Sequence, residues 1–386
     1  MSATAASRDT EAAPANTEAA APNSALDHRF MQLALSLGRR GLGRTWPNPA
    51  VGAVVVKDGV IVGRGWTQAG GRPHAETEAL KRAGKSAKGA TLYVTLEPCS
   101  HQGKTPPCVD AIIRAGIARV VSSSEDANPQ VAGQGHARLR ERGIAVEVGL
   151  GAEEAVRTHS GHFRRMREGR PQVLLKLAAS ADGKAGLPGR KPAGITGEAA
   201  RLRVHQMRAE SDAILVGIGT VLSDDPHLTC RLPGMLECSP VRVILDARLR
   251  VPLATSIIGT ARETPTWVFA GANASPVAEG ILKSKGVEVF RVEAKDGRLD
   301  LAAVVKMLAE RGITRLMVEG GPTVAAAFVE ADLVDEGALF RSPKPLGSGI
   351  DALEGLPLTA LTRSPRLKPV VTETIGDDTL ELFERS

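Results

Sequence analysis

Three residues that bind zinc well, His74, Cys99 and Cys108, occur in the first third of the chain, and Glu76 follows the histidine by two positions. Catalytic zinc takes three protein ligands and keeps a fourth position for a water molecule, whose pKa falls to about 7. Glu76 is too close to His74 in sequence to be a fourth ligand, but one helical turn allows its carboxylate to lie over the open position and carry protons. The four residues therefore predict hydrolytic attack on an amidine-like carbon.

Two interpretations without catalysis are weaker. A surface histidine with two core thiols would not explain why each cysteine follows a proline beside a predicted helix start, in Pro98-Cys99 and Pro107-Cys108. A purely structural zinc site would need four ligands and has no use for Glu76. In the first turn of its helix, the thiolate of Cys108 would be favoured by the helix dipole.

Alternating strands and helices are expected around these residues. Asp27 is expected to cap the first helix, and Asp58-Gly59 is typical of a hairpin turn. The predicted helices span 27–38, 74–84, 108–115 and 135–143, and the predicted strands span 50–57, 60–66 and 90–96, with another beginning at 120. This alternation predicts a three-layer α/β/α domain.

The pattern restarts after a charged helical stretch, 153–170, that ends at Gly169 and Pro171. The second half is expected to contain strands 173–179, 213–217, 241–245, 266–269 and 315–319, helices 197–209 and 301–311, and a further helix after the turn at 320–323. We therefore predict a disordered tail at 1–24, a zinc domain at 25–169 and a different α/β domain at 170–386.

Composition limits the partners. The chain has 386 residues, enough for two domains, and its four cysteines are too few for a disulfide framework, so Cys230 and Cys238 are expected to be ordinary thiols. The net charge of +6 invites a nucleic-acid interpretation, but only 3% of the residues are aromatic, so platforms for base stacking are scarce. A small phosphorylated substrate fits better, because arginine also serves phosphates.

Neither a membrane nor an export route is expected. No apolar run approaches the length of a membrane span, and the first two dozen residues lack the basic start and apolar stretch of a secretory signal. We therefore expect a cytoplasmic protein without membrane partners. The sequence leaves the oligomeric state open, a homo-oligomer included.

At the zinc residues the chain resembles the cytidine-deaminase superfamily, with one difference. The common second motif there is Pro-Cys-x-x-Cys, whereas eight residues separate Cys99 from Cys108 here. This longer form is similar to the deaminase half of the RibD family of bifunctional riboflavin-biosynthesis enzymes. The residues that carry the resemblance are Glu97-Pro98-Cys99-Ser100-His101, Lys104-Thr105-Pro106-Pro107-Cys108, Thr45, Pro47-Asn48-Pro49, Val51-Gly52, Asp126 and Asn128-Pro129-Gln130-Val131-Ala132-Gly133.

The resemblance implies deamination of a diaminopyrimidinone ribosyl phosphate at Zn²⁺. Asn48 would offer its amide to the pyrimidine edge. His101 and Lys104 are cations suited to the phosphate side. Asp126 and Asn128 would line the pocket.

A Gly320-Gly321-Pro322-Thr323 turn between a strand and a helix suits a phosphate, because backbone N–H groups at a helix N-terminus bind anions. Glu319 stands directly before this turn, at the strand end where α/β sheets hold their ligands. Together with 176–183, 220–226 and 228–231, these residues resemble the reductase half of the same family. That half is dihydrofolate-reductase-like in fold and uses NADPH.

The resemblance implies two sets of contacts in this half. The NADPH contacts would be Ala178, Thr220, Asp224, Gly321, Pro322, Thr323, Val324 and Ala325. The substrate contacts would be Arg208, Leu228, Arg231 and Glu319. The cofactor supplies the hydride that reduces C1′ of an opened ribose, so the protein is expected to orient the two molecules and needs no nucleophile.

The chain departs from the family at two places. Thr67 stands where the family often has a histidine, and Pro192 and Gly194 replace the serine and tryptophan of a loop motif. A degenerate reductase half is therefore one alternative. A deaminase of bases in tRNA or DNA and a regulatory zinc protein that keeps the fold are two others. Scarce aromatic residues argue against the former, and Glu76 argues against the latter.

Overall fold

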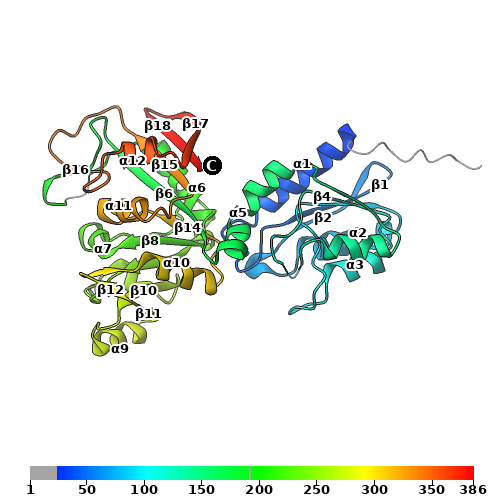
Figure 1. Ribbon diagram of the computed structural model, residues 1–386, viewed down its shortest axis with the longest axis horizontal. Coiled ribbons are helices and arrows are strands. Elements are labelled where there is room, and N and C mark those ends of the chain that lie inside the picture. The colour runs from blue at the N-terminus through cyan, green and yellow to red at the C-terminus, as the bar shows by residue number, and fades with distance from the viewer. Residues whose placement is uncertain (1–23, 130, 191–192) are drawn as a thin grey trace, which may run out of the picture.

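The computed structural model describes residues 24–129, 131–190 and 193–386, which form two large sheets joined by one long helix, α5 (Ala152–Glu168) (Figure 1). The tail predicted at 1–24 lies, apart from Ser24, outside the described residues, as does Pro192. The part of the chain around the first sheet, up to the end of α5, is called the first domain here, and the remainder the second domain.

The sheet of the first domain has five strands in the order β2-β1-β3-β4-β5. These are β1 (Gly52–Lys57), β2 (Val60–Trp66), β3 (Thr91–Val94), β4 (Arg119–Ser122) and β5 (Ala145–Val148). Strand β1 runs antiparallel to β2 and β3, whereas β3, β4 and β5 are parallel. Asp58 and Gly59 both have positive φ, as a two-residue hairpin turn requires, so this turn is confirmed.

Helices cover both faces of this sheet, which confirms the predicted three-layer arrangement. Helices α1 (Ala25–Arg39) and α5 pack on one face, and α2 (Ala75–Ala83), α3 (Cys108–Ala115) and α4 (Gln134–Glu141) pack on the other. Successive side chains of a strand point to opposite faces, so Val54 packs in the α1 layer and Val55 in the α2 and α3 layer.

The first helix is capped by Ser24, so the prediction of Asp27 as its cap is wrong. Ser24 Oγ accepts a hydrogen bond from Asp27 N at 3.2 Å, and Asp27 Oδ2 accepts one from Ser24 N at 3.2 Å. The Asp27 carboxylate also accepts two hydrogen bonds of 2.9 Å from Arg119 and one from the Tyr93 hydroxyl. Burial opposes its ionisation, yet Arg119 and Tyr93 hold the pKa of Asp27 at about 2.

The second domain is built on a nine-stranded sheet in the order β11-β10-β9-β8-β14-β6-β15-β18-β17. Its strands are β6 (Gln172–Ala179), β8 (Ala213–Gly217), β9 (Val241–Leu245), β10 (Thr266–Gly271), β11 (Glu288–Val292), β14 (Arg315–Val318), β15 (Glu336–Arg341), β17 (Leu367–Ile375) and β18 (Asp378–Arg385). The strands from β11 to β15 in this order are parallel, and β18 and β17 add an antiparallel edge. Short pairs are β7 (Lys184–Gly186) with β16 (Ile350–Asp351), and β12 (Ala294–Lys295) with β13 (Arg298–Leu299).

Helices also cover both faces of the second sheet (Figure 1). They are α6 (Glu198–Ala209), α7 (Ile218–Asp224), α8 (Ser256–Gly259), α9 (Pro276–Ser284), α10 (Leu301–Glu310), α11 (Pro322–Glu330) and α12 (Thr359–Thr362). The strands and helices predicted for this half are all present. Those missed include β15 and the hairpin of β17 and β18. Within the described residues, no helix is long and apolar enough to cross a membrane.

Replacing Asp27 by asparagine is expected to lower the free energy of unfolding at pH 7 by about 2 kcal/mol, at about 1.4 kcal/mol for each unit by which its pKa is depressed. The folded state lowers the pKa of Asp27 from 3.8 to about 2, so the stabilisation is present above about pH 4 and is lost as the pH falls toward 2. Thermal unfolding of Asp27→Asn and the parent chain at pH 7 and pH 3 measures this. Glu153→Gln is the control, because the Glu153 side chain is 85% exposed and its pair with Arg157 contributes little. An equal effect at both pH values would contradict the assignment.

Candidate active sites

The predicted zinc ligands converge in the first domain. The ligand atoms of His74, Cys99 and Cys108 all lie within 4.8 Å of one another. His74 Nδ1 is 3.3 Å from Cys108 Sγ and 3.7 Å from Cys99 Sγ. A tetrahedral zinc ion with Zn–N and Zn–S distances of about 2.0 and 2.3 Å needs such atoms about 3.6 Å apart. The geometry and the donor set therefore fit zinc.

Three separate elements bring the ligands together. His74 is the N-cap of α2, and Cys108 is the first residue of α3. Cys99 lies in the loop that follows β3, not beside a helix start as predicted. The backbone N–H of Cys108 donates a hydrogen bond to Cys99 Sγ at 3.3 Å. A free N–H group at the N-terminus of α3 is therefore satisfied by the sulfur of Cys99.

The two cysteine thiols of the site have different surroundings. The hydrogen bond from the Cys108 thiol to Cys99 Sγ lowers the pKa of Cys99 to about 4, against the effect of burial. The same hydrogen bond, together with burial, raises the pKa of the Cys108 thiol.

Glu76 is the second residue of α2 and only 4% exposed. Burial raises the pKa of its carboxyl group, while the nearby His74 opposes this effect. A carboxyl group whose pKa is shifted toward neutrality both accepts and releases protons readily. Glu76 lies close to the metal ligand His74, and its burial raises the pKa of its carboxyl group. Both features suit the predicted role of Glu76 as a proton carrier.

Glu97 organises the zinc loop, a role that the sequence analysis missed although it quoted the residue in the motif. Its carboxylate accepts hydrogen bonds from the backbone N–H groups of Asp126, Gly133, Gly135 and His136, at 2.8 to 3.3 Å. These bonds attach the segment before α4 and the first turn of α4 to the Pro98-Cys99 segment. The motif glutamate directly before Pro-Cys was the available signal.

Asn48 lies at the edge of the zinc site. Its Nδ2 donates to the carbonyl oxygen of Gly71 at 2.7 Å, three residues before His74. Gly71 has φ +82°, and a Cβ there would lie 2.6 Å from Asn48 Nδ2, so only glycine allows this approach. The side-chain oxygen of Asn48 is not the atom in this bond and remains suited to a ligand.

The other predicted deaminase residues differ in their surroundings. Asp126 Oδ1 accepts the backbone N–H of Asn128 at 2.9 Å and also lies 2.9 Å from His162 Nε2 of α5. Burial opposes ionisation, but His162 keeps the pKa of Asp126 below its usual value. His101 and Lys104 are exposed in the loop between the two cysteines. The Asp126 carboxylate thus holds α5 and the Asn128 turn, while the side chains of His101 and Lys104 face solvent.

Thr67, which stands where the family often has a histidine, has a structural role. Thr67 is only 2% exposed, and its Oγ1 accepts a hydrogen bond from the backbone N–H of Val51 at 3.1 Å. The hydroxyl therefore tethers the end of β2 to the segment before β1.

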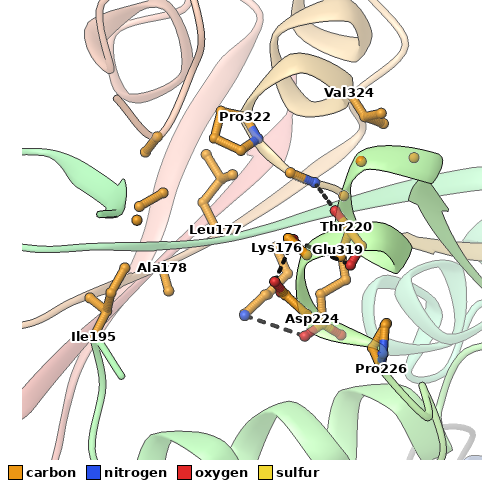
Figure 2. A pocket seen from close by; sticks show the side chains of 18 of the residues that line it. Lys176, Leu177, Ala178, Ile195, Thr220, Asp224, Pro226, Glu319, Pro322 and Val324 are labelled. Carbon is orange, nitrogen blue, oxygen red and sulfur yellow. Dashed lines mark hydrogen bonds and ion pairs between the residues drawn. The ribbon is translucent and has the colours of Figure 1, made fainter. Parts of the chain in front are cut away.

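A cavity of about 400 Å³ opens at the carboxyl ends of β6, β8 and β14 in the second domain (Figure 2). Ten of the twelve residues predicted for the reductase site line it, namely Ala178, Arg208, Thr220, Asp224, Leu228, Glu319, Gly321, Pro322, Thr323 and Val324. Ala325 is fully buried on α11 and Arg231 is exposed, and neither lines the cavity. Sequence reasoning missed Lys176, Ile195, Thr196 and Arg201.

Glu319 is held between two cations in this cavity, Arg208 and Lys176, of which Figure 2 shows Lys176. Arg208 donates to both carboxylate oxygens at 2.9 Å, and Lys176 Nζ lies 3.4 Å from Oε1. Burial opposes ionisation, but Lys176 and Arg208 hold the pKa of Glu319 at about 2. The cavity therefore presents an ionised carboxylate with a nearby ammonium group, which suits hydroxyl groups of a sugar.

The N-terminus of α11 forms the opposite wall. Gly321 is its N-cap and donates its N–H to Thr220 Oγ1 of α7 at 3.0 Å. A Cβ at Gly217 or Gly320 would lie within 2.8 Å of Val324, so both strand ends need glycine beside this helix. Glycine backbone next to a helix N-terminus fits the phosphates of a dinucleotide. The loop with Gly194 offers no aromatic ring, and its Ile195 lies at the cavity instead (Figure 2).

Two family profiles match the chain. The cytidine and deoxycytidylate deaminase zinc-binding region matches residues 24–124, and the RibD C-terminal domain matches residues 171–380. These matches confirm the predicted fold class, a cytidine-deaminase-like domain followed by a reductase domain.

Similar proteins cover the chain almost completely. The riboflavin biosynthesis protein RibD of Aquifex aeolicus is 42% identical over 360 residues, which cover 93% of this chain and 99% of that protein. RibD of Escherichia coli is 43% identical and covers 91% of this chain, with 97% of its own length matched. The solved structure of Acinetobacter baumannii RibD has a TM-score of 0.83 at 35% identity and covers 94% of this chain and 99% of its own. The deaminase/reductase from Thermotoga maritima has a TM-score of 0.81 at 37% identity with the same coverage.

Cys99→Ser and Cys108→Ser are each expected to lose zinc, because a hydroxyl group is a poorer ligand than a thiolate. After dialysis, elemental analysis of the parent chain should find about one zinc per chain, and each variant should retain less than about a tenth. Cys238→Ser is the control, because it removes a buried thiol in the second domain. Equal zinc content in all four proteins would refute the ligand assignment.

Proposed function

The chain belongs to the RibD family of bifunctional deaminase/reductases in riboflavin biosynthesis, and from this premise we propose how its own residues divide the work. The enzyme combines a zinc-dependent deaminase with an NADPH-dependent reductase. We assign residues 25–169 to deamination and residues 170–386 to reduction.

We propose that the first domain deaminates 2,5-diamino-6-(5-phosphoribosylamino)pyrimidin-4-one. The observation that carries this proposal is the convergence of His74, Cys99 and Cys108 beside the buried Glu76. Zinc, when bound, supplies a water molecule that is acidic near neutral pH. The Glu76 carboxylate accepts a proton from that water and returns it to the amino group that leaves as ammonia.

Substrate binding would use the groups around the ligands. Asn48 holds the pyrimidine edge with its side-chain oxygen, and Asn128 is set by its bond to Asp126. Asp126 acts through this turn, since its Oδ1 is engaged by Asn128 and His162. His101 and Lys104, whose side chains are both exposed, meet the ribosyl phosphate.

The second domain then reduces the ribosyl group to a ribityl chain. NADPH, when bound, supplies the hydride. We propose that Ala178, Thr220, Asp224 and residues 321–325 bind this cofactor, and that Ala325, which is buried on the inner face of α11, contributes by anchoring that helix in the core. Glu319, aligned by Arg208, holds ribose hydroxyls, and Leu228 and Arg231 complete the substrate side. The cavity with its ionised Glu319 supports an active reductase over a degenerate one.

We further propose that the substrate is the small phosphorylated pyrimidine and that neither nucleic acid nor membrane is a partner. A cavity of about 400 Å³ suits a small molecule. The four unpaired cysteines fit a reducing compartment, so we assign the protein to the cytoplasm. A homo-oligomer is compatible with this function.

Incubation with the diaminopyrimidinone phosphate, followed by mass spectrometry, tests both steps. Without NADPH the product should have exchanged an amino group for oxygen, and with NADPH it should carry two further hydrogens. Deamination without NADPH oxidation would instead support a degenerate second half.

Glu76→Gln is expected to keep its zinc and to release ammonia about a thousandfold more slowly, because an amide cannot carry the proton. Ammonia release and zinc content are measured on the same preparation. Glu78→Gln is the matched control, since Glu78 lies on the same helix and pairs with Arg82. Unchanged turnover in Glu76→Gln would sink the proposed mechanism.

Arg208→Ala is expected to lower kcat/KM of the reductase about a hundredfold and to spare deamination, because Glu319 loses its bidentate partner. NADPH oxidation is followed with the deaminated substrate, and ammonia release with the original one. Arg203→Ala on the same helix, where Arg203 bonds to Gln206, serves as control. Loss of both activities would contradict the division between the domains.

A further inference from the structure

The loop that carries Asn48 is anchored in the second domain. Trp46, two residues before Asn48, is half-buried and packs against the main hydrophobic core of the second domain. Its ring meets Trp267 of β10 edge to face, with centroids 6.4 Å apart and planes at 84°. A residue of the deaminase loop thus completes the core of the reductase domain.

The surface that receives Trp46 is firmly held. Trp267 is only 4% exposed, and its Nε1 donates to Glu288 Oε1 at 2.9 Å. Phe290 packs on it with centroids 5.6 Å apart, and the Arg311 guanidinium lies 5.7 Å from its ring centroid. Trp46 therefore rests on side chains that have little freedom to move.

Backbone contacts hold the neighbouring residues of the same loop. Gly312 has φ +98°, and a Cβ there would lie only 2.7 Å from Pro47 Cβ. Arg165 of α5 donates to the carbonyl oxygens of Ala309 at 2.7 Å and Pro47 at 3.4 Å. A Cβ at Gly43 would lie 2.2 Å from the carbonyl oxygen of Ala209. The loop lies against the second domain over several residues.

The same loop reaches the zinc site. Asn48 N donates to the carbonyl oxygen of Thr45 at 2.9 Å, which closes a turn around Trp46 and Pro47. Asn48 Nδ2 then donates to Gly71, three residues before His74. The position of Asn48 over the site is therefore set from one side by its own domain and from the other by Trp46.

We propose that Trp46 is a positioning residue for deamination, and that the second domain is through Trp46 a structural part of the deaminase site. The inference rests on the proposed function of Asn48 in holding the pyrimidine. Trp46 does not touch the substrate; it holds the turn that presents the asparagine.

Contacts other than those of Trp46 also join the two domains. Gly161 of α5 lies against Thr314, where a Cβ would come within 2.5 Å of the carbonyl oxygen. Arg165 also bonds to Ala309 without involving the tryptophan. Removal of the indole should therefore leave the domains joined and release the loop alone.

The first test compares Trp46→Ala and Trp46→Phe in the full-length zinc enzyme. Trp46→Ala should raise KM for deamination about tenfold or more with a smaller change in kcat, because binding is misaligned while Glu76 is unmoved. Zinc content, and NADPH oxidation with the deaminated substrate, should stay within about twofold of the parent chain. Trp46→Phe, which keeps an aromatic ring on Trp267, should restore KM.

The second test disturbs the loop from the other domain. Gly312→Ala places a methyl group against Pro47 and should also raise KM for deamination about tenfold. Gly143→Ala is the matched control. Both glycines stand in a Glu-Arg-Gly-Ile segment between a helix and a strand with positive φ, but nothing lies within 4 Å of a Cβ at Gly143.

The results separate this inference from the proposed function. A parent chain that releases no ammonia would refute the function itself. Normal deamination kinetics in Trp46→Ala, or equal effects of Gly312→Ala and Gly143→Ala, would overturn the positioning role alone. A parallel loss of both activities in Trp46→Ala would also overturn it, because Trp46 would then only stabilise the fold.

Discussion

A charge removed from water must be met by donors or cations of the protein, and buried carboxylates organise both sites of this enzyme. Glu97 accepts four backbone N–H groups and thereby fixes the turn that presents Cys99. Glu319 meets Arg208 and Lys176 and stays ionised. Glu76 is buried under conditions that raise its pKa instead. Three glutamates thus differ in their surroundings and not in their chemistry, which suits Glu97 to holding structure and supports the roles proposed for Glu319 and Glu76.

A buried carboxylate that needs hydrogen-bond donors also shapes the contact between the two domains. Asp212 is fully enclosed in the second domain and accepts the backbone N–H groups of Thr314 and Arg315 as well as the Thr314 hydroxyl, at 2.6 to 2.9 Å. These bonds set the turn that runs from Gly312 into β14. On one side of that turn lies Gly161 of α5, and on the other lies Pro47. A carboxylate in the reductase domain therefore shapes the surface on which the deaminase loop rests.

Sequence reasoning succeeded where the signal is local. The convergence of His74, Cys99 and Cys108 follows from residue type and spacing, and most strands and helices follow from apolar periodicity. Sequence reasoning failed where a side chain bonds to a residue far away in the sequence. Asp27 was predicted to cap a helix because its role with Arg119, 92 positions away, leaves no local pattern. The edge strand β17 was missed because it is exposed on both faces and has no apolar alternation.

Long-range contacts also explain why the sites could be predicted only in part. That Arg208 and Glu319 pair with each other, 111 positions apart, could not be read from motifs that assign both to substrate. Because of this pairing, the Glu319 carboxylate is already oriented and its charge is balanced before a ligand binds. Its side chain would therefore need to move little on binding. Trp46 illustrates the same point for the other site. Within the family motif it reads as a spacer between Thr45 and Pro47, but the ring it meets, Trp267, lies in the other domain. A bifunctional chain can therefore support the site of one domain with a side chain that packs in the core of the other.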